Sequence, residues 1–301
     1  MNKPILLIWL TLREVDEFTA TEAQVQRWTQ EVPELEVIYA KTQEEFIRNL
    51  SKATYIFCFK FSEAWLGLTY RAKWIATPGA GKELLGPIPE RLNPTFGTFH
   101  GDIMAETVVG MLLAIRRGLL PGLGLGDAKD PWPVHLPRRT TIAGSHAVIL
   151  GYGNIGQCIG QKLSALGVQV TGIRRANFNQ LDELLPTADA LILALPQTPE
   201  TDHLLNATRI AKLSKQSVVI NVGRGNAIDE KALCKALKEG QLWAAFLDVM
   251  HEEPYPGGLL TETPRCYILP HASAFAPDYL DRAFDEWLHI YRTTYATPNN
   301  P

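Results

Sequence analysis

The chain has 301 residues, of which 46% are hydrophobic and 20% are charged, and its formal net charge is −3. This composition is typical of a folded globular protein, and the small net charge excludes the basic footprint of a nucleic-acid-binding protein. The sequence has no apolar run of about 18 residues, so we expect no membrane partner. A chain of this length predicts two domains, because single hydrophobic cores stop growing at about 250–300 residues.

The chain begins with the short apolar run Ile5–Leu10, which is too short for the core of a signal peptide with a cleavage site. The four cysteines are scattered and form no C-x-x-C pair. This distribution favours small buried side chains in a reducing compartment over disulfides or metal ligands. Both observations predict a cytoplasmic protein.

Apolar runs alternate with helix-like segments over the first 97 residues, which predicts a parallel sheet with crossover helices. The expected strands are Ile5–Leu10, Leu35–Tyr39, Tyr55–Phe59 and Trp74–Thr77, and the expected helices include Ala23–Glu31 and Thr42–Ser51. A turn-rich stretch, 86–94, then precedes a long helix predicted over Asp102–Gly118. This helix is apolar on one side and basic at its C-terminal end.

An irregular glycine-rich arm, from Leu120 to Pro137, precedes a second α/β block over about 140–272. The strands expected in this block are 146–150, 168–173, 189–195, 217–222, 244–248 and 266–269. An amphipathic helix is predicted over Asp278–Tyr295.

Gly151, Gly153 and Gly156 form a G-x-G-x-x-G pattern between an apolar strand and a helix-like run. Gly151 would make the tight turn, Gly153 would let a pyrophosphate approach the backbone, and Gly156 would let the helix pack on the sheet. The helix, which opens with Asn154 and Ile155, would offer N–H groups and a partial positive charge to the phosphates. The pattern predicts dinucleotide binding.

Arg174 and Arg175 follow the next predicted strand, about twenty residues after the first glycine. NAD-selective domains usually have an acidic residue there, which binds the ribose hydroxyls. Two guanidinium groups can instead form charge-assisted contacts with a 2′-phosphate. We therefore predict NADP(H) as the cofactor, with a solvated basic turn as the alternative.

Two further segments lie at predicted strand ends, where open α/β sheets bind their ligands. Leu195 and Pro196 follow one strand, and Arg224 follows another between Gly223 and Gly225. An arginine flanked by glycines is either a helix cap or an anion clamp. The glycines favour the clamp, because they allow a ligand to come close.

Several phrases occur together in an order that is typical of a known family. They are Gly151–Gly156, Leu195–Thr201, Asn221–Gly225, Leu247–Val249 with Glu253–Pro254, and Leu269–His271. Together they resemble the D-isomer-specific 2-hydroxyacid dehydrogenases, most closely the NADPH-using glyoxylate/hydroxypyruvate reductase branch. The resemblance covers nearly the whole second block and is weaker before residue 97, where Gly79–Gly81 is similar to the family's substrate loop.

The resemblance implies roles that the reduction of a 2-oxo acid also requires. Arg224 would hold the carboxylate and carbonyl oxygens with its fork of N–H groups. His271 would give a proton to the carbonyl oxygen as hydride arrives. Glu253 would bond the other imidazole nitrogen, orient the ring and favour its protonated form. Glu252 is the competing carboxylate, but the family pattern of glutamate directly before proline selects Glu253.

The resemblance also implies the remaining site residues. The backbone N–H groups of Ala80 and Gly81 would share the substrate carboxylate, and Asp248 would meet the nicotinamide carboxamide. No metal is expected, and His100, His203 and His251 are predicted to be surface or loop residues. The predicted cofactor-binding set is Gly151, Gly153, Asn154, Ile155, Gly156, Arg174, Arg175, Leu195, Pro196, Asp248 and Ser273.

The chain departs from the family in two places near these residues. Lys82 and Glu83 stand where the substrate loop usually has an apolar residue and an aspartate, and Phe275 comes soon after His271. Lys82 would either add positive charge near the pocket or lie in solvent. The departures leave the identity of the substrate open.

The predicted fold is α/β, with two doubly wound parallel-sheet domains. The resemblance implies a Rossmann cofactor domain, residues 99–275, inserted in a flavodoxin-like substrate domain, residues 1–98 and 276–301. The predicted helix Asp102–Gly118 is similar to the family's crossover helix. The resemblance implies that this helix and the arm after it form the interface of a homodimer, with a packed surface loop as the alternative. Trp132 in the arm would either pack or reach the pocket of a neighbouring subunit.

The predicted function is hydride transfer from NADPH to a small 2-oxo acid such as glyoxylate or hydroxypyruvate. One alternative is a phosphite or formate dehydrogenase on the same fold, although the formate-oxidising relatives have glutamine where Glu253 stands. Another alternative is a non-enzymatic module that senses nicotinamide redox state and binds a protein, as related corepressors with extra tails do.

Overall fold

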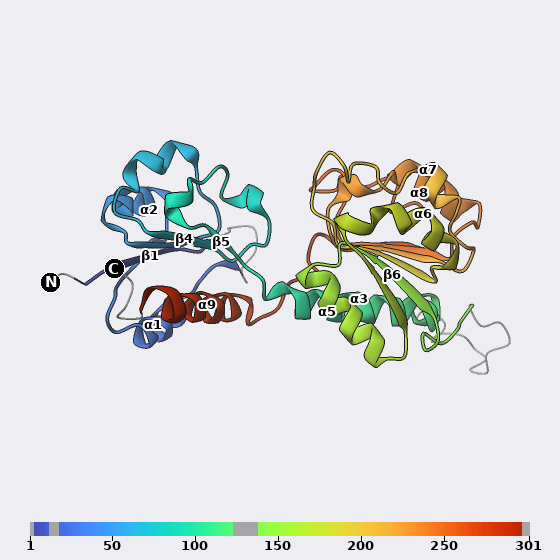
Figure 1. Ribbon diagram of the computed structural model, residues 1–301, viewed down its shortest axis with the longest axis horizontal. Helices are drawn as coiled ribbons and strands as arrows, with labels where there is room; N and C mark the ends of the chain where they lie inside the picture. The colour runs from blue at the N-terminus through green and yellow to red at the C-terminus, as the bar shows by residue number, and fades with distance from the viewer. Residues whose placement is uncertain (1–2, 12–17, 123–137, 297–301) are drawn as a thin grey trace. The chain divides into compact units, whose positions relative to one another are not determined.

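The computed structural model describes residues 3–11, 18–122 and 138–296. The chain divides into two compact units (Figure 1). Unit 1 comprises Met1–His100 and Phe275–Pro301, and unit 2 comprises Gly101–Ala274. Most of the glycine-rich arm, including Trp132, lies outside the described residues.

Unit 1 contains a five-stranded parallel sheet in the order β2-β1-β3-β4-β5, which is the flavodoxin-like doubly wound order. The strands are β1 (Ile5–Trp9), β2 (Glu36–Tyr39), β3 (Tyr55–Cys58), β4 (Trp74–Thr77) and β5 (Thr95–Phe96). The first four confirm the predicted strands to within one residue. The two-residue strand β5 was not predicted, because it is too short to show a periodic pattern.

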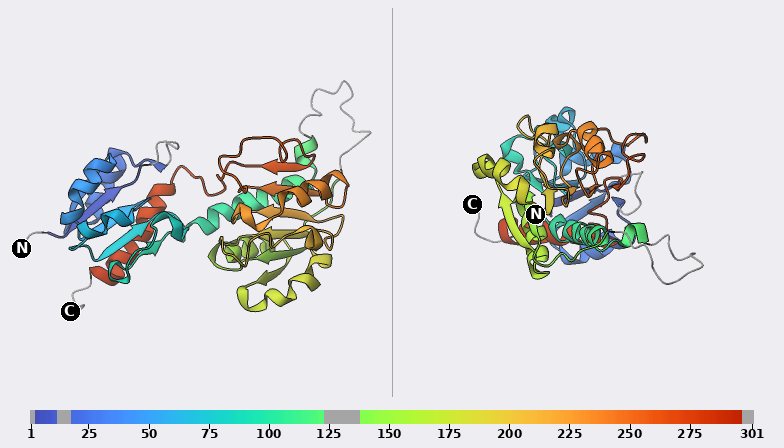
Figure 2. Two further views of the ribbon diagram at one scale, coloured as in Figure 1. Left: turned by 90° about the horizontal axis from the view of Figure 1, so that it is seen from above. Right: turned by 90° about the vertical axis from the view of Figure 1, so that its right-hand side faces the viewer.

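Helices cover both faces of this sheet. Helix α2 (Gln43–Asn49) lies on one face, and α1 (Glu22–Glu31) and α9 (Tyr279–Ile290) lie on the other (Figures 1 and 2). Trp287 of α9 stacks on Trp74 of β4 at a ring distance of 5.1 Å, so both ends of the chain build this unit. The remaining helical segments are short: Leu50–Lys52, Glu63–Leu68, Lys82–Leu84 and Glu90–Leu92, with a π-turn at Tyr291–Tyr295.

Unit 2 contains a six-stranded parallel sheet in the order β11-β10-β9-β8-β6-β7. The chain winds in opposite directions on either side of β6 and β8, so the topological switch point lies between them. All six strands lie within two residues of their predicted ends: β6 (His146–Leu150), β7 (Gln169–Ile173), β8 (Ala190–Leu193), β9 (Val218–Asn221), β10 (Ala244–Leu247) and β11 (Cys266–Ile268). Four of them, β6, β8, β9 and β10, are buried over most of their length, as expected for strands covered on both faces.

Helices α3 (His100–Arg116) and α5 (Asn154–Ala165) lie on one face of the unit 2 sheet (Figure 1). Helices α6 (Leu181–Leu184), α7 (Ala207–Ile210) and α8 (Glu230–Lys238) lie on the other. The short segments are α4 (Leu119–Gly122) and the 3₁₀ turns Arg175–Gln180, Leu185–Thr187 and Gly225–Ala227. In the described part of the chain, no helix is both long and apolar enough to cross a bilayer.

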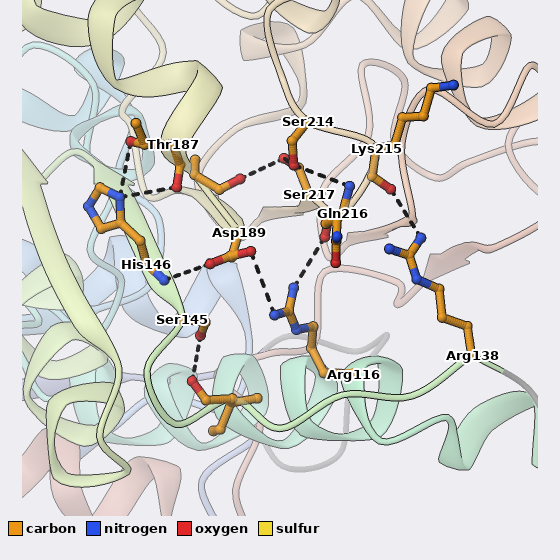
Figure 3. A network of polar contacts seen from close by, with 12 residues as sticks. Arg116, Arg138, Ser145, His146, Thr187, Asp189, Ser214, Lys215, Gln216 and Ser217 are labelled. Atoms are coloured by element: carbon orange, nitrogen blue, oxygen red, sulfur yellow. Dashed lines mark hydrogen bonds and ion pairs between the residues drawn. The ribbon is translucent and has the colours of Figure 1, made fainter.

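A polar network holds the C-terminal end of α3 against the amino edge of this sheet (Figure 3). The Arg116 side chain is 5% exposed; its Nη1 donates to the Gln216 carbonyl at 3.2 Å, and its Nη2 lies 3.7 Å from Asp189. The Arg116 and Arg138 guanidinium carbons lie 5.1 and 4.4 Å from the centre of the Trp243 ring. Arg116 therefore anchors the crossover helix in addition to complementing its dipole.

The prediction that His100 is a surface or loop residue was wrong. His100 is 5% exposed, and its Nε2 lies 2.9 Å from the hydroxyl of Tyr279 in α9. Burial lowers the pKa of His100 to about 4, because desolvation disfavours the charged imidazole. The prediction failed because packing by a helix far away in sequence leaves no local pattern. The four cysteines are free thiols; Cys58 and Cys234 are buried, as predicted, whereas Cys158 and Cys266 are only partly buried.

Candidate active site

The packing of the glycine loop requires glycine at Gly151 and Gly156, whereas Gly153 leaves open space. Gly151 has a φ of +88°, and a Cβ there would lie 2.4 Å from the Ala194 carbonyl oxygen, so only glycine fits. Gly156 is buried in the first turn of α5. A Cβ at Gly153 would meet no atom within 4 Å, so the space before the N-terminus of α5 is open. This cradle, which continues into α5 at Asn154 and Ile155, fits the pyrophosphate of a dinucleotide.

Tyr152, inside the glycine motif, was not singled out from the sequence. A Cβ at Gly172 would lie 2.2 Å from Tyr152 Cγ, and one at Gly160 would lie 2.6 Å from the Tyr152 hydroxyl. The Tyr152 ring therefore occupies the space left by two glycines of β7 and α5, and this packing orients the glycine loop. The signal that could have revealed it is Gly172 itself, because an interior glycine weakens a strand unless something packs closely there.

Arg174 and Arg175 have different partners. Arg174 donates from Nε to the Tyr152 carbonyl at 2.9 Å, and its backbone N–H donates to Asn177 Oδ1 at 2.7 Å. Arg175 donates from Nη2 to Glu200 Oε1 at 3.0 Å. Both arginines are exposed. One guanidinium is thus held by the glycine loop and the other by the loop after β8, which includes the buried Leu195 and the exposed Pro196.

Gly223 and Gly225, which were expected to let a ligand approach Arg224, lie against the backbones of neighbouring loops. A Cβ at Gly223 would lie 2.5 Å from the backbone of Leu195, and one at Gly225 would lie 1.9 Å from the Met250 carbonyl oxygen. They allow neighbouring loops, rather than a ligand, to come close. Arg224 is half-buried, and its Nη1 donates to the Gly223 carbonyl at 2.8 Å.

His271 and Glu253 form a hydrogen-bonded pair. The His271 Nδ1 atom lies 2.8 Å from Glu253 Oε2, and Glu253 Oε1 accepts the Met250 N–H at 3.0 Å. His271 has a φ of +50°, and its side chain is 51% exposed. A ring held through Nδ1 presents Nε2 on its opposite side, which is the arrangement of an imidazole that transfers a proton there.

Asp248 is buried and holds the segment that carries His271. Its Oδ1 accepts the N–H groups of Ala272 and Ser273 at 2.8 and 2.9 Å, and its Oδ2 accepts the Ser273 hydroxyl. The His271 N–H donates to the Asp248 carbonyl at 2.8 Å. Burial raises the pKa of Asp248. The predicted contact of Asp248 with the nicotinamide carboxamide stays a prediction.

The predicted site residues are shared between the two units. Arg224, Asp248, Glu253 and His271 all follow the carboxyl ends of the adjacent strands β9, β10 and β11 in unit 2. Ala80 and Gly81 follow β4 in unit 1, where Ala80 is exposed. Lys82 is also exposed. Among the described residues, no group of three or more His, Cys, Asp or Glu side chains is arranged to hold a metal ion.

Comparisons with known proteins identify the family. The model of the "D-isomer specific 2-hydroxyacid dehydrogenase, NAD binding domain" matches residues 109–273, which is more than half of the chain. The chain belongs to the D-isomer specific 2-hydroxyacid dehydrogenase family. Membership makes it an oxidoreductase whose unit 2 carries the nicotinamide-dinucleotide-binding domain.

Individual relatives lie in the same family. The chain is 29% identical to a glyoxylate reductase of Thermofilum pendens over 77% of its own length and 76% of that protein. It is 32% identical to a glyoxylate reductase of Pyrococcus horikoshii over 56% of each chain. A D-isomer specific 2-hydroxyacid dehydrogenase family structure from Aeromonas salmonicida is 26% identical, with a TM-score of 0.80 over 99% of this chain and 97% of that one. The glyoxylate reductase branch and the two-domain α/β fold of the 2-hydroxyacid dehydrogenases are thus both supported.

Proposed function

We propose that this 2-hydroxyacid dehydrogenase reduces a small 2-oxo acid, such as glyoxylate or hydroxypyruvate, to the D-2-hydroxy acid with NADPH. The observation that carries the proposal is the Glu253–His271 pair, with 2.8 Å between carboxylate and imidazole, at the same sheet edge as Arg224. The similarity to proteins named glyoxylate reductase supports this substrate class.

Arg224 binds the substrate carboxylate in this proposal. A guanidinium presents N–H donors in a planar fork that matches a carboxylate, which lysine cannot reproduce. The proposed substrate domain comprises residues 1–98 and 276–301. Within it, the backbone N–H groups of Ala80 and Gly81 would also bind the substrate carboxylate. These contacts orient the 2-oxo acid, and orientation of the reactants supplies a large share of the rate enhancement.

His271 supplies the proton. Its Nδ1 is bonded to Glu253, so the proton for the substrate oxygen leaves from Nε2. Glu253 stabilises the imidazolium and fixes the ring plane, while Asp248 holds the backbone of the segment 271–273. The bound dihydronicotinamide would supply the hydride. The dinucleotide itself would be held by the glycine loop, Leu195, Pro196, Asp248 and Ser273.

Arg174 and Arg175 select NADPH in this proposal. Both lie at the end of β7, where dinucleotide-binding folds recognise the ribose, and neither is a carboxylate that would repel a 2′-phosphate. Glu200 neutralises part of the charge of Arg175, so the selectivity depends mainly on Arg174.

The experiment is to follow the oxidation of NADPH and of NADH with glyoxylate and with hydroxypyruvate. We expect turnover with NADPH and much less with NADH. Arg224→Ala should abolish most turnover and retain NADPH binding, whereas the control Arg282→Ala, on an exposed arginine of α9, should retain both. Turnover by Arg224→Ala would remove this arginine from the mechanism. Turnover of phosphite or formate but of no 2-oxo acid, or tight NADPH binding without any turnover, would favour one of the alternatives.

We also propose that the enzyme is a cytoplasmic homodimer that uses the crossover helix α3 and the arm that follows it. Light scattering of the purified protein tests this assembly. A monomeric mass at micromolar concentration would contradict it.

A further inference from the structure

Glu230 connects helix α8 to the loop that carries Glu253. It is the first residue of α8, after the N-cap Asp229, whose Oδ1 accepts the Ala232 N–H at 3.0 Å. The Glu230 Oε1 atom accepts the backbone N–H of His251 at 2.7 Å, from 21 residues away in the sequence. A bond between an amide and an ionised carboxylate is about twice as strong as one between neutral groups. This bond therefore holds the loop from Asp248 to Glu253 on the N-terminus of α8.

Two consecutive N–H groups of this loop are bound by two different carboxylates. The Met250 N–H donates to Glu253 at 3.0 Å, and the His251 N–H donates to Glu230 at 2.7 Å. Glu253 uses its other oxygen for His271. The position of the Glu253 carboxylate therefore depends on the backbone at Met250 and His251, which Glu230 restrains.

The same loop packs directly on the loop of Arg224. A Cβ at Gly225 would lie 1.9 Å from the Met250 carbonyl oxygen and 2.5 Å from the His251 nitrogen, so the two backbones touch. From Gly225 the chain runs through the 3₁₀ turn Gly225–Ala227 into α8 and reaches Glu230. The segment after Arg224 thus carries, within six residues, the carboxylate that binds the loop of Glu253.

We propose that Glu230 is a positioning residue that sets the Glu253–His271 pair relative to Arg224. It acts through the His251 N–H and the Arg224–Glu230 segment and does not itself touch the substrate. Without it, the contact at Gly225 would still keep the loops adjacent, but the backbone would lose the polar restraint at His251. Glu253 would then move relative to His271. The inference rests on the proposed function, since it assigns a catalytic consequence to the contact.

The kinetic test compares Glu230→Ala with Glu230→Gln. The glutamine keeps an oxygen that accepts the His251 N–H, so it should restore what alanine loses. We expect Glu230→Ala to lower kcat for the 2-oxo acid about tenfold, as loss of orientation does, with unchanged NADPH affinity. We expect Glu230→Gln to stay within about twofold of the unmodified enzyme. The matched control is Glu239→Ala at the other end of α8, which should leave kcat unchanged.

A second readout is independent of turnover. Hydrogen exchange of the peptide that covers 249–253 should become faster in Glu230→Ala, because the His251 amide loses its acceptor, and should not change in Glu230→Gln or Glu239→Ala. Unchanged exchange in Glu230→Ala, or a loss of kcat that glutamine fails to restore, would overturn the positioning role. If the unmodified protein reduces no 2-oxo acid, the proposed function fails, while the exchange experiment still decides whether Glu230 restrains the loop.

Discussion

The carboxylate of Glu253 bonds His271 Nδ1 at 2.8 Å through one oxygen and the Met250 N–H at 3.0 Å through the other. One side chain thus orients the imidazole and is itself oriented by its own loop. This arrangement needs an acceptor on each side, which explains why a carboxylate suits the position.

Glu253→Gln removes the negative charge of this pair and keeps the size of the side chain. The glutamine amide can still accept the Met250 N–H, but its NH₂ group would then face Nδ1 and favour the imidazole tautomer that has no proton there. We expect kcat to fall by about 10²-fold or more, with a melting temperature close to that of the unmodified protein. Steady-state kinetics and thermal unfolding measure the two quantities. Nearly full activity would contradict the role of Glu253 in proton donation.

Gly153→Ala tests the cofactor cradle. A Cβ at Gly153 meets no atom of the protein within 4 Å, so the variant should fold normally. The added methyl group would occupy the space that a pyrophosphate needs, so we expect NADPH affinity to fall at least tenfold. The control is Gly110→Ala in helix α3, where a Cβ also meets nothing. Equal NADPH affinities in a fluorescence titration of both variants would place the cofactor elsewhere.

Arg174 and Arg175 should contribute unequally to cofactor selection. Arg174 is oriented by its bond to the Tyr152 carbonyl, whereas Arg175 is already paired with Glu200. A hydrogen bond to a charged group is worth about 1.5–3 kcal/mol, so we expect Arg174→Ala to weaken NADPH binding at least tenfold. Arg175→Ala should have an effect of about threefold, since exposed ion pairs are weak and Glu200 competes with the phosphate.

Affinities for NADPH and NADH, measured for both variants, check this order. NADH binding should change little in either variant, because NADH lacks the 2′-phosphate. A loss of NADH affinity as large as that of NADPH would contradict phosphate recognition by these arginines.

His100 should make the stability of the protein depend on pH. Burial lowers its pKa from 6.5 to about 4. Between these two pH values, His100 is therefore protonated in the unfolded chain and neutral in the folded protein. The contribution of His100 to the free energy of unfolding is therefore fully present above pH ~6.5. It is lost as the pH falls towards the pKa of His100 in the folded protein. By pH ~5 the loss from this group reaches about 2 kcal/mol.

Urea unfolding at about pH 7.5 and pH 5 measures this dependence. In His100→Gln the difference between the two unfolding free energies should shrink by about 2 kcal/mol, and in the exposed control His289→Gln it should not change. An unchanged pH dependence in His100→Gln would show that His100 is not the responsible group.

Much of the fold could be predicted from local patterns. Strands such as β8 and β9 are buried along their whole length, so they read as continuous apolar runs bounded by turn residues. The turn at Gly151 was equally predictable, because the positive φ of this residue arises locally, between a strand and the helix that follows it. The strand β5 and the buried state of His100 could not be predicted, since neither leaves a local pattern.

The candidate site divides in the same way. The sequence by itself determined the residue types at the strand ends, the family and the chemistry that Arg224, Glu253 and His271 are suited to. Only the tertiary structure decided the partners: Arg175 with Glu200, Tyr152 against Gly172, Asp248 with the 271–273 backbone, and Glu230 with His251. The physical reason is that a strand, a turn or a glycine loop is specified by neighbours in the chain. A hydrogen bond between two loops depends instead on where the sheet places their ends, and no spacing along the chain records that.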